Sequence, residues 1–452
     1  MIERRPLLAF SFGWVLFLLL SAACVPTADP ISPTITSPII EPSLAQTTAV
    51  VPSPLPPTDE SNTPLEVPAE IPSPAMTESP DLITRPGEPI ARLAPGTRLV
   101  LESIWMMDAA TGWAAGGVND DRAHILTTSN GGETWRDVTP PEPVTENASI
   151  LAVAAFFLDA DTGWAAFQRA PTAEGFLAPI VWRTTDRGET WMQGEPLDVS
   201  GFMGFYGPSR IGFSDPEHGW ILLDLDSAMM HRYVAIYATE DAGLHWTRVV
   251  DPDTDAPIQT GDKTGLVLGS AGIGLLTRDL HGLVEGVSVE ITRDGGATWE
   301  SIPLALPENV AVSQLCWSHS PVVFSETTLA VGVSCREWNE SGSGEDNWLD
   351  GAAYIFLTYD GGQIWERVDA PGGILMYLPG DVILSLGRDI HRSEDGGRSW
   401  RFVKHVSWDA NFSFVSVQLG WAAARAEDEH ALVQTLDGGR TWIALEPCIS
   451  QE

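Results

Sequence analysis

One eight-residue pattern, Ser/Thr-x-Asp-x-Gly-x-x-Trp, with Asn130 in place of Asp in the first copy, recurs seven times in this chain and constrains its fold more than any other feature. The closest successive copies start 35 residues apart, at Thr358 and Ser393, and the most distant start 66 apart, at Thr292 and Thr358. The seven copies begin at Thr128, Thr184, Thr239, Thr292, Thr358, Ser393 and Thr435. A signature that returns at this spacing indicates a repeat architecture with one supersecondary unit per copy.

The chemistry of this octapeptide predicts a tight turn between two β-strands. A short Asp or Asn side chain accepts hydrogen bonds from nearby backbone N–H groups, and a following Gly tolerates a positive φ. Apolar runs such as 234–239 and 353–358 precede the turn, and the Trp enters the next strand. We assign structural roles to the acid or amide and the Trp of each copy: Asn130 and Trp135, Asp186 and Trp191, Asp241 and Trp246, Asp294 and Trp299, Asp360 and Trp365, Asp395 and Trp400, Asp437 and Trp442.

A second pattern, Asp-x-x-x-Gly-Trp, lies upstream of several octapeptides and predicts a second hairpin in each unit. It ends at Trp113, Trp164 and Trp220, and a weaker form ends at Trp421. Two hairpins make a four-stranded antiparallel unit of about 50 residues, which is the size of one propeller blade. We therefore expect an all-β fold, a seven-bladed β-propeller, with the Trp side chains filling the space between blades.

The predicted blades can be placed along the chain, although the way the ring closes stays open. They cover 98–142, 147–199, 203–251, 259–304, 310–369, 372–404 and 406–446. Blade six has the fewest residues, so its strands are expected to be short. Either residues 90–99 add an outer strand to blade seven, or the ring closes by packing alone.

These two motifs together resemble a known group of proteins. The octapeptide is similar to the Asp-box, or bacterial neuraminidase, repeat of sialidases, sortilins and related propellers. Its combination with Asp-x-x-x-Gly-Trp resembles the photosystem II assembly and stability factor family over roughly 95–446. The resemblance implies a seven-bladed propeller that binds a protein. Photosynthetic members are thought to dock their client through a basic face, and this chain has no matching Arg cluster.

The N-terminal residues predict where the protein works. Residues 1–24 have the charged start, apolar core and small residues of a bacterial lipoprotein signal, which makes Cys24 the expected site of lipid attachment. Ordinary signal cleavage and an uncleaved anchor are the alternatives. Residues 25–90, rich in Pro, Thr and Ser, predict a disordered stalk, followed by the propeller at 91–448. We expect an extracytoplasmic protein, lipid-anchored on the bacterial cell membrane.

Charge limits the partners of the propeller. The chain has 61 acids and 25 Lys or Arg, of which ten acids and three bases lie in residues 1–90, so the rest carries 51 and 22, or about −29. This field opposes nucleic acid and anionic lipid, which require clustered Lys and Arg. We expect no nucleic-acid partner, membrane attachment through the lipid alone, no cofactor, no metal and a monomer. The partner is expected to be a protein or, as an alternative, a glycan.

Loop lengths suggest which face binds that partner. The octapeptide turns keep one length and are expected on one rim of the ring. The loops between the second and third strands and the connections between blades vary in length, and these are expected on the other rim. Long loops on a rigid scaffold often carry function. The candidate binding residues are the apolar and aromatic side chains of these loops, which could also pack as lids: Phe176, Tyr206, Met229, Met230, Trp338 and Trp348.

Two further features leave alternatives open. Cys316 and Cys335 lie in runs expected to be adjacent strands of blade five, so they form either a disulfide or two buried thiols. A sialidase-like or endoglucanase-like hydrolase is the alternative function, although the Phe/Tyr-Arg-Ile-Pro segment of sialidases is missing. Endoglucanases use two carboxylates, and spacing cannot choose among the acids on the proposed face, namely Asp224, Asp226, Asp346 and Asp350. We assign no catalytic residue.

Overall fold

The computed structural model describes one compact unit, which lies within 86–452. Its described residues are 88–119, 121–144, 150–169, 177–202, 207–228, 231–253, 256–269, 272–279, 287–311, 314–325, 327–338 and 348–451. The expected signal peptide with Cys24, most of the expected stalk, and four candidate binding residues therefore lie outside the described residues. Those four are Phe176, Tyr206, Met229 and Met230.

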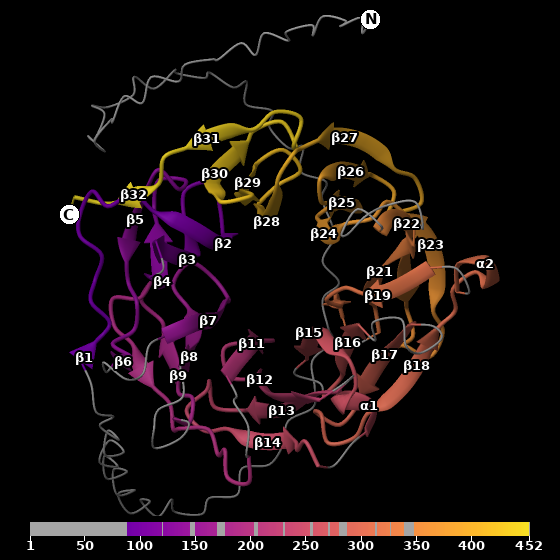
Figure 1. The fold of residues 1–452 in the computed structure, drawn as a ribbon, viewed down its shortest axis with the longest axis horizontal. Coiled ribbons are helices and arrows are strands. Elements are labelled where there is room, and N and C mark those ends of the chain that lie inside the picture. The colour runs from indigo at the N-terminus through magenta and orange to yellow at the C-terminus, as the bar shows by residue number, and fades with distance from the viewer. Residues whose placement is uncertain are drawn as a thin grey trace, which may run out of the picture. The chain divides into compact units, whose positions relative to one another are not determined.

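Seven antiparallel sheets stand around a central axis, which confirms the predicted all-β, seven-bladed propeller (Figure 1). Blades one to three contain β2 (Val100–Met106), β3 (Gly112–Val118), β4 (Asp121–Thr128) and β5 (Thr134–Asp137); β7 (Ile150–Phe157), β8 (Gly163–Arg169), β9 (Val181–Thr184) and β10 (Met192–Gln193); and β11 (Gly207–Phe213), β12 (Gly219–Ala228), β13 (His231–Thr239) and β14 (Thr247–Val250). Within each blade the strands follow one another in sequence order, with the first strand nearest the axis.

The remaining four blades repeat this order. They contain β15 (Asp262–Leu268), β16 (Gly274–Asp279), β17 (Val287–Thr292) and β18 (Glu300–Leu304); β19 (Gln314–Ser318), β20 (Val322–Val323), β21 (Leu329–Trp338), β22 (Trp348–Thr358) and β23 (Glu366–Ala370); β24 (Ile374–Leu378), β25 (Val382–Leu386), β26 (Asp389–Ser393) and β27 (Arg401–His405); and β28 (Asp409–Phe414), β29 (Gly420–Ala426), β30 (Glu429–Thr435) and β31 (Ile443–Leu445). In the described part of the chain, helix is limited to the four-residue α1 (Ala256–Gln259) and α2 (Glu308–Ala311).

The octapeptides form the same turn in every blade. In blade two, the Thr184 hydroxyl accepts a hydrogen bond from the Gly188 N–H, and Asp186 Oδ1 accepts one from the Thr190 N–H. Gly188 has a φ of 77°, a conformation that costs glycine little. The residue after the acid or amide donates its backbone N–H to a carbonyl in the turn between the first two strands of its blade. The seven donors are Gly131, Arg187, Ala242, Gly295, Gly361, Gly396 and Gly438. Both kinds of turn therefore share one rim, the octapeptide rim.

The indoles of the Gly-Trp motif join one blade to the next. The Nε1–H groups of Trp113, Trp164 and Trp421 donate to backbone carbonyls of the following blade at 2.8–2.9 Å, and all three side chains are fully buried. The octapeptide Trp246, by contrast, is only half-buried and donates to Gly243 of its own turn. Hydrophobic clusters likewise lie between neighbouring blades. The Gly-Trp indoles thus link the blades in this part of the ring.

The ring closes in a way that neither of the two expectations gives. Residues 90–99 do not extend blade seven, because Asp137 of blade one accepts a hydrogen bond from the Leu93 N–H at 2.9 Å and holds the segment there. Instead β32 (Cys448–Ile449) pairs in parallel with β5 and adds a fifth strand to blade one. At the N-terminal side, β1 (Glu88–Pro89) pairs with β6 (Pro143–Val144). The two ends of the described chain are therefore both fastened near blade one.

Side chains complete the joint between blades seven and one. Asn411 Oδ1 accepts a hydrogen bond from the Ile104 N–H at 3.0 Å, and Ser413 Oγ accepts one from the Met106 N–H at 2.8 Å. Both acceptors come from β28, and both donors belong to the inner edge of β2. Packing and these two bonds therefore close the ring together with β32.

Candidate functional site

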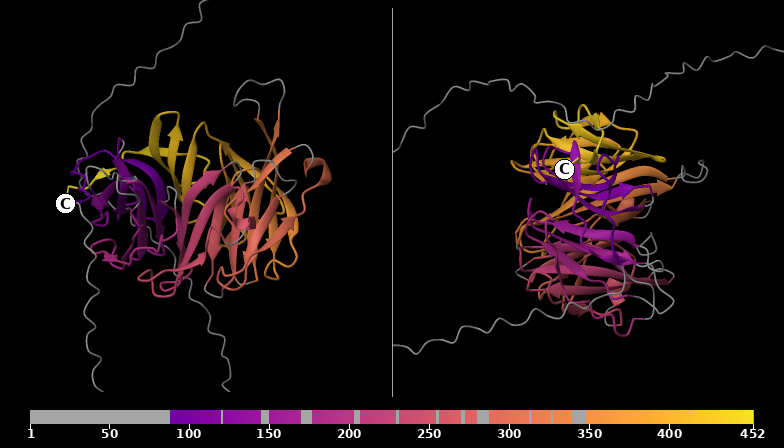
Figure 2. Two further views of the ribbon diagram at one scale, coloured as in Figure 1. Left: turned by 60° about the horizontal axis from the view of Figure 1, so that its bottom comes forward. Right: turned by 90° about the vertical axis from the view of Figure 1, so that its left-hand side faces the viewer.

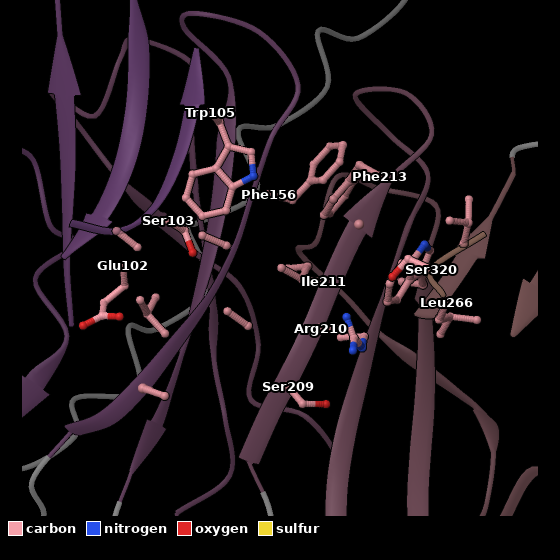
Figure 3. A pocket seen from close by; sticks show the side chains of 18 of the residues that line it. Glu102, Ser103, Trp105, Phe156, Ser209, Arg210, Ile211, Phe213, Leu266 and Ser320 are labelled. Carbon is pink, nitrogen blue, oxygen red and sulfur yellow. The ribbon is translucent and has the colours of Figure 1, made fainter. Parts of the chain in front are cut away.

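A cavity of about 1330 Å³ lies at the hub, where the innermost strands of several blades meet (Figure 3). Its walls come from β2, β7, β11 and β15 of blades one to four, from parts of β3, β4 and β12, and from Ser320 and residues 323–325 of blade five. The inner strands start at the rim opposite the octapeptide rim and run towards the octapeptide rim. We call that opposite rim the long-loop rim; it carries the ends of second strands and the starts of third strands.

The cavity has an aromatic part and a polar part. Trp105, Phe156 and Phe213 come near the ends of β2, β7 and β11, and so line it towards the octapeptide rim (Figure 3). Glu102 and Arg210 come earlier in their strands and line it closer to the long-loop rim. The cavity therefore offers apolar contact at depth and charged or polar groups nearer the long-loop rim.

The charged groups of the cavity are held in different ways. Arg122 donates to Glu102 Oε1 at 2.5 Å, and both residues belong to blade one. Arg210 instead donates to the Lys263 carbonyl at 3.2 Å. Burial lowers the pKa of the Arg210 guanidinium, an effect that the nearby Asp224 carboxylate opposes. Among the described lining residues, Arg210 is thus a partly desolvated cation whose hydrogen bond goes to a neutral acceptor.

Two candidate binding residues lie at the long-loop rim. Trp338 ends β21 and Trp348 begins β22, and they are opposite one another in the register of the pair. The structure describes their backbone and not their side chains. Figure 2 shows the hairpin of β21 and β22 extending past the other strands on one side of the ring. The structure therefore places these two residues on a projecting hairpin, away from the hub cavity.

A disulfide joins Cys316 of β19 to Cys335 of β21. The two residues are paired in register. Because β19 is the inner strand of blade five and β21 continues into the projecting hairpin, the bond fastens the hairpin base to the hub. Of the two alternatives left open by the sequence, the structure contains the disulfide.

Sequence reasoning did not single out the lining of the hub. Trp105 and Phe156 each lie three residues before the Asp of an Asp-x-x-x-Gly-Trp motif, so the motif itself could have located them. Leu151, whose side chain is 54% exposed, and Arg210 carry no such signal. Leu151 and Arg210 line the same cavity only because the inner strands of blades two and three are neighbours around the axis.

The acids near the hub give little support to a two-carboxylate mechanism. Glu102 and Asp121 line the cavity, and both come from blade one rather than from facing blades. Asp224 is in an ion pair with Arg232 at 3.0 Å. The side chains of Asp226, Asp346 and Asp350 are outside the described set. Within the described ranges, no three His, Cys, Asp or Glu side chains are grouped to hold a metal ion, and no helix has the length and apolarity needed to span a membrane.

Comparison with known proteins gives matches among solved structures alone. No family model and no curated protein matches the chain. YCF48 bound to D1 peptide shares 20% identity over 76% of this chain and 96% of that chain, with a TM-score of 0.46. YCF48 from Cyanidioschyzon merolae shares 16% identity over 76% of this chain and 98% of that chain, with a TM-score of 0.43. The GH74 enzyme of Niastella koreensis shares 14% identity over 77% of this chain and 63% of that chain, with a TM-score of 0.36. At these identities the similarity concerns the fold alone.

Proposed function

We propose that this protein is a non-catalytic binding scaffold that holds a segment of a partner protein at the long-loop rim and in the hub cavity. We further propose that it works outside the cytoplasm, tethered to the cell membrane through a lipid on Cys24 and the stalk of residues 25–90. The lipoprotein-like signal and the Pro-rich composition of 25–90 support the tether.

The size and lining of the hub cavity carry the proposal. Its volume of about 1330 Å³ exceeds the roughly 300–1,000 Å³ of pockets that enclose small ligands. Two large apolar side chains in its wall are exposed, Leu151 by 54% and Phe324 by 46%. Apolar surface that a folded protein leaves uncovered in a concave site is typical of a place where another molecule binds.

The character of the lining favours a protein over a glycan undergoing hydrolysis. A hydrolase of the two-carboxylate type needs acids on both sides of the bond that is cleaved. The described acids of the cavity, Glu102 and Asp121, both lie in blade one. An aromatic and aliphatic part beside a polar and charged part is instead typical of a protein-binding site.

Photo-crosslinking in intact membranes tests the proposal. A photoreactive amino acid replaces Leu151 in the hub cavity or, as a matched control, Met192 on outer strand β10 of the same blade; the two native side chains are similarly exposed, at 54% and 48%. We expect one protein to be captured from Leu151 and not from Met192. That protein, once purified, should bind the wild type and bind Leu151→Glu more weakly.

Two results would contradict the scaffold function. One is capture from both positions alike, or from neither. The other is turnover of a member of a polysaccharide panel by the purified protein, with no protein partner recovered. The tether is tested separately, because Cys24→Ser should release the protein from the membrane fraction without changing its binding.

A further inference from the structure

We propose that the partner segment binds as an added β-strand along the inner edge of β7, which faces the hub cavity. This inference rests on the proposed function and specifies how the partner is held. The segment would be extended, free of proline, largely apolar, and would carry one acidic side chain.

The exposed edge of β7 is the first observation. Among the described strands β7 is hydrogen-bonded to β8 alone, so its other edge has no hydrogen-bonded strand there. Seven consecutive residues, 150–156, line the cavity. A strand that presents one face would contribute every second residue. A continuous run shows that the backbone edge itself borders the cavity, where its N–H and C=O groups can pair with another extended chain.

A comparison of β7 with β2 is the second observation. The inner edge of β2 is covered, because Asn411 and Ser413 accept hydrogen bonds from two of its N–H groups. Within the described residues, the inner edge of β7 receives no comparable side-chain cap. Its sequence, ILAVAAFF, also contains none of the charged residues or prolines with which proteins protect edge strands. The small side chains of Ala152 and Ala155 leave this backbone accessible.

The dimensions of the edge set the length of the segment. At about 3.3 Å per residue, the seven lining residues of β7 span roughly 23 Å, enough for a partner segment of six or seven residues. Alternate side chains of that segment would face the aromatic part of the cavity around Trp105 and Phe156. The period of two in a strand therefore predicts apolar residues at every second position.

The acidic position follows from Arg210. This guanidinium lines the cavity on β11, the inner strand next to β7 around the axis, and its described hydrogen bond goes to the Lys263 carbonyl. The nearby Asp224 carboxylate offsets the burial of this cation only in part, because its pKa stays lowered, and an acidic side chain of the segment would offset more of that cost. One acid near the long-loop end of the segment is therefore expected, because Arg210 lies early in β11.

A displayed library of random linear heptapeptides provides the probe. It is selected on the full-length wild type, and the enriched peptides are measured on Leu151→Glu and on the control Met192→Glu. Both side chains are about half exposed, so both variants should fold, which circular dichroism checks. We expect peptides with alternating apolar residues whose affinity falls about tenfold or more on Leu151→Glu and stays unchanged on Met192→Glu.

Backbone methylation separates strand addition from simple insertion. An enriched peptide is N-methylated at its odd or its even positions, which removes the N–H groups on one edge while keeping the side chains. We expect one of the two forms to lose binding and hydrogen exchange to slow at residues 150–156. Binding in the cavity that survives both methylation patterns would overturn strand addition and leave the scaffold function intact. If no peptide is enriched on the wild type, strand addition is also overturned. Crosslinking at Leu151 would still test the scaffold function independently.

Discussion

Replacing Trp164 with Ala should destabilise the propeller more than replacing Trp246, a half-buried Trp of an octapeptide. The Trp164 side chain has no exposed surface, stacks on Phe213 of the next blade with ring centroids 3.7 Å apart, and donates to the Ala242 carbonyl at 2.9 Å. Trp246 is the matched control, because it belongs to blade three, is half-buried, contacts the same Phe213 edge-on at 6.1 Å, and bonds within its own turn.

The structure sets the magnitude of this difference. A fully buried Trp removes about 200 Å² from water, which at about 25 cal/mol per Å² corresponds to about 5 kcal/mol. Trp246 keeps only a minor part of its surface in water, so its burial corresponds to about 4 kcal/mol. Each substitution also leaves a backbone carbonyl without its donor, that of Ala242 or that of Gly243, so this cost of about 1 kcal/mol is common to both variants. We therefore expect Trp164→Ala to cost about 1 kcal/mol more than Trp246→Ala.

Urea unfolding of the full-length protein, followed by fluorescence and far-ultraviolet circular dichroism, measures this difference, provided that the two transitions coincide. Trp164→Phe should fall between wild type and Trp164→Ala, because it keeps the stack on Phe213 and loses the N–H donor. Equal losses for Trp164→Ala and Trp246→Ala would refute the idea that the Gly-Trp indoles hold neighbouring blades together.

Three more outcomes follow from other contacts. Replacing Cys316 and Cys335 together with Ser should lower the free energy of unfolding by about 3 kcal/mol, because the disulfide restricts the unfolded chain. Ile449→Ala should cost about 3 kcal/mol, since this buried residue pairs with β5 and closes the ring. Burial by itself lowers the pKa of His124, but hydrogen bonds and charges from Asp137 and Asp121 outweigh it and raise that pKa. This stabilisation is complete below the unfolded value of about 6.5 and is lost as the pH rises through the folded value, so His124→Gln should lower the thermal midpoint more at about pH 6 than at about pH 9.

Each of these has a control in the same chain. Peptide mapping of the wild type must recover Cys316 linked to Cys335, and its failure would remove the basis of the first prediction. Ile443, which is 57% exposed on β31, should tolerate Ala with little loss, and an equal cost at Ile449 and Ile443 would argue against closure by β32. A His124→Gln penalty that does not change with pH would mean that the imidazole contributes through packing and not through its charge.

The sequence by itself determined the fold class, the number of blades and the position of each turn. It could do so because the chemistry of the octapeptide is local: in blade two, Thr184, Asp186 and Gly188 form their turn from groups at most four residues apart. Repetition of that turn, with apolar runs between the copies, leaves few arrangements other than a ring of sheets.

Only the tertiary structure decided which contacts join the blades and which side chains meet at the hub. The two kinds of Trp look alike in sequence, yet Trp164 reaches the next blade while Trp246 bonds to its own turn. Closure by Cys448–Ile449, and the meeting of Leu151 with Arg210 at the hub, join residues far apart in the chain. Such contacts depend on how seven sheets pack around one axis, and no local pattern encodes that geometry.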